Sequence, residues 1–120
     1  AAEEELERVA GQAGLDLDFL RSVSPDTLIM LISPTGEPEP GRCWITAELF
    51  LVDGLNSEDV GDVEGALDRY ERARLLYELL GPGIIARGFP EVSERLDEVR
   101  ARIANLTGGA TNAIGPASPP

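Results

Sequence analysis

The side chains of this sequence that could do chemistry are almost all carboxylates. The chain has 22 acidic residues and no histidine, so it lacks the commonest general base near neutral pH and the commonest protein ligand of metals. Its ten basic residues are all arginine, which leaves no lysine for a Schiff base or a P-loop. The single cysteine, Cys43, stands beside Trp44 in an apolar stretch, where a buried and unreactive thiol is expected. These absences favour a non-catalytic protein.

The acidic stretch DGLNSEDVGDVE, which begins at Asp53, is where the carboxylates come closest to a known kind of site. Its acids miss the alternating ligand register of an EF-hand calcium loop, so we predict no metal site there. Glu58 and Asp59 could form an acid/base pair, but on a turn we expect them to be solvated. We therefore expect no catalytic residue, no metal and no cofactor. A small carboxylate-dependent enzyme is an alternative, and a cleft enclosing two acids with raised pKa values would support it.

Net charge and composition restrict the class of protein and of partner. The formal net charge of -12 would repel nucleic acid and anionic membranes, so we expect neither as a partner. The acidity either serves a basic partner or keeps the protein soluble, as in proteins that work in high salt. A chain of 120 residues, 42% of them hydrophobic, predicts one soluble domain. Because it shows no apolar run of signal-peptide or membrane-spanning length, we expect a cytoplasmic location.

Two long stretches are expected to form the centre of the fold. The first, from Cys43 to Leu55, is apolar nearly all round and must be covered on more than one side, with Trp44 in the core. In the second, from Gly61 to Leu80, the apolar residues have the three-and-four spacing of one helix face: Val63, Ala66, Leu67, Tyr70, Ala73, Leu76, Tyr77 and Leu80. A neighbouring helix can approach closely at Ala66 and Ala73 and must accommodate the Tyr70 ring between them. We predict that these two helices pack together.

The same region resembles a known family in the spacing of five small or aromatic residues: Gly54, Gly61, Ala66, Tyr70 and Ala73. They stand at the relative positions of such residues in the tetratricopeptide (TPR) helix hairpin, and GDVEGALDRYERA resembles its second helix with the preceding turn. One repeat would run from Ala47 to about Leu80, in a hairpin at about residues 42–81. An ordinary antiparallel helix pair without family relation is the alternative.

The TPR resemblance implies a binding surface on the first helix of the hairpin. The residues that would line an inner groove combine acids with apolar side chains: Glu48, Leu51, Val52, Leu55, Glu58 and Asp59. Such a row implies that the ligand is a basic or amphipathic segment of another protein. In the alternative, Leu51, Val52 and Leu55 are buried under the preceding short helices and no groove exists.

Three helices are expected before the hairpin. The first covers about residues 2–13, and the second follows an N-cap at Asp16, with Leu17, Leu20 and Phe19 facing inward. Ser24 and Pro25 begin a third helix that runs to about Ile32, although its apolar run would also suit a buried strand. The prolines and glycines of residues 33–41 predict a loop.

The last predicted helix covers residues 90–106 and carries a narrow apolar stripe, made of Val92, Leu96, Val99, Ile103 and Leu106. This stripe either covers the hairpin, as the last helix of TPR-like proteins does, or pairs with a second copy of the chain. Residues 107–120 have the composition of a disordered tail. The sequence therefore predicts an all-α bundle of five or six helices in one domain, residues 1–106. We expect a protein interaction or assembly module, with a self-associating homodimer as the alternative.

Overall fold

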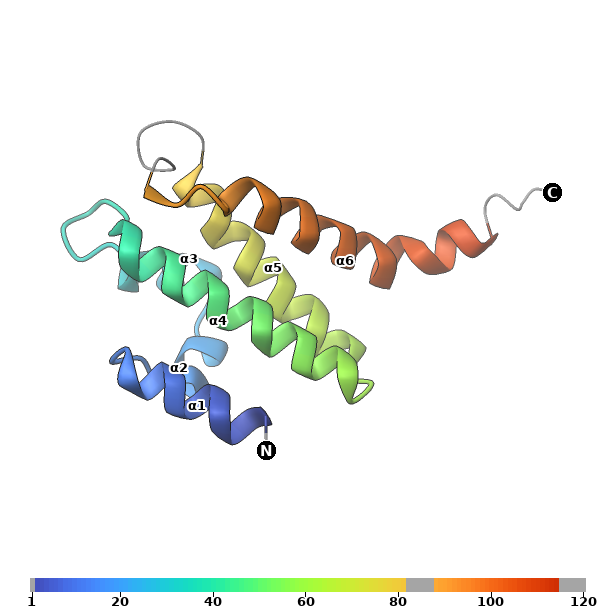
Figure 1. Ribbon diagram of the computed structural model, residues 1–120, viewed down its shortest axis with the longest axis horizontal. Helices are drawn as coiled ribbons and strands as arrows, with labels where there is room; N and C mark the ends of the chain where they lie inside the picture. Colours follow the sequence, from blue (N-terminus) through green and yellow to red (C-terminus); the bar gives the residue numbers. More distant parts are fainter. Residues whose placement is uncertain (1, 82–87, 115–120) are drawn as a thin grey trace.

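The protein is an all-α bundle in which two long helices form the centre (Figure 1). A computed structural model describes residues 2–81 and 88–114, the last six of these by backbone alone. The described residues form six helices and no strand, which confirms the predicted fold class. In chain order they are α1 (Ala2–Gln12), α2 (Leu17–Ser22), α3 (Pro25–Leu31), α4 (Pro40–Asp59), α5 (Val63–Leu80) and α6 (Val92–Ile114). No helix in this described part has both the length and the apolar character needed to span a membrane.

The short helices α2 and α3 begin at the capping residues that the sequence predicts. The Asp16 carboxylate accepts a hydrogen bond from the Phe19 backbone N–H, and the Ser24 hydroxyl accepts one from Thr27. The competing strand prediction for the apolar run of α3 is therefore wrong. The prediction that Phe19 faces inward is also wrong, because Leu17 and Leu20 occupy the buried side of α2 and leave Phe19 half exposed.

Helix α4 begins before the predicted loop of residues 33–41 ends. Glu39 is its N-cap, and the Glu39 carboxylate accepts hydrogen bonds from the backbone N–H groups of Gly41 and Arg42. Pro40 occupies the first turn, where its missing N–H leaves no hydrogen bond unmade. The proline that seemed to exclude a helix therefore starts one.

Helices α4 and α5 form an antiparallel hairpin packed at the residues predicted for close approach. Ala66, Tyr70 and Ala73 are fully buried. The Tyr70 ring lies so close to Gly54 that a Cβ added there would be 2.5 Å from Tyr70 Cε1. The turn uses Gly61 at a φ of 82°, which favours glycine, followed by Asp62 as the N-cap of α5.

The core lies mainly between α4 and α5, with α3 and α6 covering its sides. Phe50 is fully buried at its centre. The Cys43 thiol is also buried and donates to the Leu76 carbonyl, and burial raises its pKa to about 12. Trp44 was predicted to be a core residue but is only partly buried. Its ring stacks on Phe89 at a centroid distance of 5.3 Å and meets Tyr77 edge-on, so it marks the edge of the core.

Helix α6 packs along α5, on the opposite side of the hairpin from α1 (Figure 1). Val92 and Val99 of its apolar stripe are buried in the same core as α4 and α5. The backbone continues past the predicted end at Leu106 to Ile114. The Thr107 hydroxyl is bonded to the Ile103 carbonyl within this extension. Residues 107–114 of the predicted disordered tail are therefore helical. Residues 115–120 lie outside the described residues, and disorder of that segment stays a prediction.

Candidate functional site

An apolar groove lies between α1 and α4 on the described surface. It has a volume of about 640 Å³. Because α1 runs antiparallel to α4, the beginning of α1 meets the end of α4 at one end of the groove (Figure 1). The residues that line it come from α1 and the residue after it, namely Ala2, Glu5, Leu6, Val9, Gln12 and Ala13, and from α4, namely Trp44, Ile45, Glu48, Leu49, Val52 and Asn56.

The groove exposes apolar side chains because α1 covers only part of the outer face of α4. Leu6 and Leu49 are buried where the two helices touch. Val9, Ile45 and Val52 remain 40%, 42% and 43% exposed along the groove. These residues form one continuous apolar surface, of the kind that marks interaction sites.

Glu48 is an acidic residue of the groove that is also tied to the two following helices. Glu48 Oε1 accepts a hydrogen bond from the Tyr77 hydroxyl and another from Arg95 Nε, the latter at 2.9 Å. The Arg95 guanidinium also lies 5.7 Å from the centre of the Trp44 ring. Burial, and next the bond to Glu48, raises the pKa of Tyr77, so its hydroxyl keeps the proton that it donates. Side chains of α5 and α6 therefore fix the position of the Glu48 carboxylate.

Glu58 makes the same pair of bonds ten residues further along α4. Its Oε1 accepts from the Tyr70 hydroxyl at 2.6 Å and from Arg102 Nη1 at 3.4 Å. Burial, followed by the bond to Glu58, raises the pKa of Tyr70 as well. Unlike Glu48, Glu58 does not line the groove.

A second polar cluster surrounds the buried carboxylate of Asp53. Arg21 of α2 donates to both Asp53 oxygens, at 2.7 and 2.6 Å, and Arg69 of α5 donates to Oδ2 at 3.0 Å. Arg21 also holds both carboxylate oxygens of Glu3, at 2.9 Å each. The bonds to Asp53 and then Glu3 raise the pKa of Arg21. Since the cluster joins α1, α2, α4 and α5, it stabilises the position of α1 against the hairpin.

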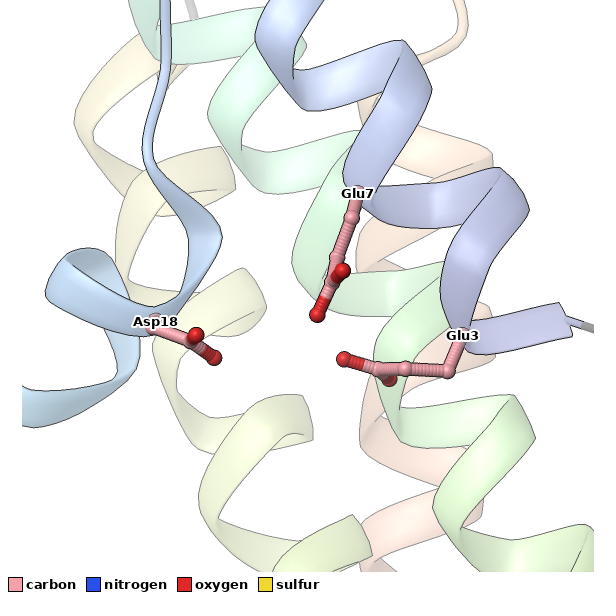
Figure 2. Close-up of side chains that lie close together, drawn as sticks. All are labelled: Glu3, Glu7 and Asp18. Atoms are coloured by element: carbon pink, nitrogen blue, oxygen red, sulfur yellow. The ribbon is translucent and has the colours of Figure 1, made fainter.

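Three carboxylates, from Glu3, Glu7 and Asp18, point toward one another where α1 meets α2 (Figure 2). One oxygen of each lies within 4.8 Å of the others, and all three residues are exposed. The bond to Arg21 lowers the pKa of Glu3, whereas the bond to Glu3 raises the pKa of Glu7. Both oxygens of Glu3 are already engaged by Arg21. These three carboxylates lie on an open surface and not in an enclosing cleft.

The structure divides the residues predicted to bind a partner among three places. Glu48 and Val52 line the groove. Leu51 is buried and Leu55 partly buried in the main core. Glu58 is bonded to α5 and α6, and Asp59 is exposed beside a polar cavity that includes Asp53. These residues share one face of α4, and the division arises because part of that face packs into the core and against α6 while its other edge borders the groove beside α1.

The contribution of α1 to the groove, and most of the α4 residues in it, were not predicted from the sequence. Ile45, Leu49, Val52 and Asn56 recur at the spacing of one helix face, and Leu6 and Val9 belong to the apolar stripe of α1. The sequence pattern that could have indicated the groove is that α4 is apolar nearly all round, so that one apolar side stays uncovered after α5 packs against it. The apolar patterns of α1 and α4 do not indicate that these two helices lie side by side.

The residues predicted for self-association are used within the chain itself. Val92 and Val99 are buried, and Leu96 and Ile103 are partly buried against the same core. Of the two roles predicted for this stripe, covering the hairpin is the one that the fold displays.

Comparison of the chain with protein-family models, with curated proteins and with solved structures finds no match. The TPR resemblance accordingly rests on the five residues that carry it, and functional inference rests on the groove and its surroundings.

Proposed function

We propose that this protein is a non-catalytic protein–protein interaction module, built on a TPR-like α4–α5 hairpin, that holds an amphipathic helix of another protein. The observation that carries the proposal is the apolar groove between α1 and α4, with Val9, Ile45 and Val52 exposed along it. From Trp44 to Asn56 the groove spans about 18 Å at 1.5 Å per residue, the length of about three helical turns. A helix that lays apolar residues at i, i+3, i+4 and i+7 into such a groove would cover them.

Charge complementarity indicates that the occupant is basic. The chain has a net charge of -12, and the groove contains Glu5 and Glu48, which pair with Arg8 and Arg95, but no lining arginine. A negative surface increases the rate at which a positively charged segment associates, and it disfavours acidic competitors. The proposed partner is therefore an amphipathic helix with basic residues on its polar face.

A peptide of leucine and lysine, arranged as an amphipathic helix of about four turns, is a defined probe for this site. We expect isothermal titration calorimetry to show binding in the micromolar range, and the Trp44 fluorescence to change on binding because Trp44 lines the groove. Val52→Asp should weaken binding at least tenfold, since it places a charge among the apolar contacts. Val60→Asp is the matched control, because Val60 is exposed on the same chain but lies outside the groove.

Three outcomes would contradict the proposal. The wild-type protein could fail to bind the peptide, or Val52→Asp and Val60→Asp could weaken binding equally. In the third outcome, a second copy of the chain occupies the groove and the protein is a homodimer. Analytical ultracentrifugation would then give a stable dimer mass that Val52→Asp converts to a monomer mass.

A further inference from the structure

We infer that Glu48 is the residue that selects a basic partner, by accepting one lysine or arginine side chain of the occupant through its Oε2 atom. This inference rests on the proposed function of the groove and adds to it the contact that determines specificity. The overall negative charge attracts any basic segment, whereas a single oriented carboxylate selects the position of one basic residue.

The first argument is the way in which Glu48 is held. Both of its internal hydrogen bonds, from Tyr77 and Arg95, end on Oε1, and neither uses Oε2. The side chain is 32% exposed and lies in the groove lining. Two bonds to one oxygen orient the carboxylate before any partner arrives, so the second oxygen can accept a bond at a small entropic cost.

The second argument is the surroundings of Glu48 in the groove. Ile45, Leu49 and Val52 stand three, one and four residues from it on the same helix, and Trp44 precedes it by one turn. A lysine or arginine that reaches Oε2 can lay its aliphatic stem along the exposed side chains of Ile45 and Val52 while its charged end meets the carboxylate. The site thus fits both parts of a long basic side chain.

Glu58 provides an unusually close control for this inference. It lies on the same helix, is 33% exposed, and its Oε1 accepts from a tyrosine of α5 and an arginine of α6, as Glu48 Oε1 does. It does not line the groove. Glu58→Gln therefore alters the same kind of internal contact as Glu48→Gln and leaves the groove intact.

The test is a set of lysine-to-glutamine peptides, each changed at one lysine of the leucine–lysine helix, titrated into three proteins. Against the wild type and Glu58→Gln, one peptide of the set should bind about fivefold more weakly than its parent, the size of effect typical for a partly exposed ion pair. Against Glu48→Gln, that peptide and the parent should bind equally. The peptide changes require no alteration of the protein, so the wild-type titrations do not depend on how the variants fold.

The results separate this inference from the proposal on which it rests. If the wild type and Glu48→Gln respond to every peptide in the same way while Val52→Asp still abolishes binding, the groove binds a helix but Glu48 does not select it. If the wild type binds no peptide of the set, both the proposed function and the role of Glu48 are overturned.

Discussion

Replacing Gly54 with alanine tests the closest contact in the bundle. A Cβ at this position would lie 2.5 Å from Tyr70 Cε1 and 2.6 Å from Cδ1, well inside van der Waals contact. The ring has no room to move, because Tyr70 is fully buried and its hydroxyl is bonded to Glu58 at 2.6 Å. The added methyl group must therefore separate α4 from α5 or displace the tyrosine.

The expected loss of stability is the difference between two opposing effects. Alanine in a helix interior is favoured over glycine by about 1 kcal/mol. Overpacking a rigid core costs about 1–3 kcal/mol, and the short distance in this contact places Gly54→Ala at the upper end. We expect a net decrease in the free energy of unfolding of about 2 kcal/mol, which for a chain of this size lowers the Tm by about 8 °C.

Thermal and urea unfolding followed by circular dichroism would measure this change. Gly11→Ala in α1 is the matched control, because a Cβ there meets nothing within 4 Å and the substitution should be neutral or stabilising by up to about 1 kcal/mol. If Gly54→Ala proved as stable as Gly11→Ala, the close approach of Tyr70 to α4 would be refuted.

Two further predictions concern buried polar groups. Asp53→Asn should lower the free energy of unfolding by about 3 kcal/mol, because it leaves Arg21 and Arg69 without the buried carboxylate that both contact, and an unchanged urea midpoint would contradict this. Burial raises the pKa of Cys43 from 9.0 to about 12, so the folded protein keeps a thiol proton that the unfolded chain releases. Its contribution to stability is therefore complete below pH 9.0 and is lost as the pH rises from 9.0 to about 12. Urea titrations across this range should show a shallower decrease for Cys43→Ala than for the wild type, and equal slopes would count against a buried thiol.

The candidate site could be predicted only in part, for a reason that α4 makes plain. The row from Glu48 to Asp59 was taken from the TPR resemblance as one binding surface. In the fold, Leu51 and Leu55 pack into the main core, Glu58 is bonded to α5 and α6, and only Glu48 and Val52 of this row line the groove beside α1. On a helix that is apolar nearly all round, the pattern does not indicate which side will stay uncovered.

The sequence by itself determined the fold class and the starts of α2 and α3, because these depend on side chains within a few residues of one another. Asp16 and Ser24 each cap a helix by accepting a hydrogen bond from a backbone N–H three residues ahead, and the three-and-four spacing around Tyr70 sets the buried face of α5. Only the tertiary structure decided that α1 lies antiparallel beside α4, and hence that a groove exists. That arrangement depends on contacts between distant segments, such as Arg21 with Asp53, and on the surface of α4 that remains once α5 has packed against it.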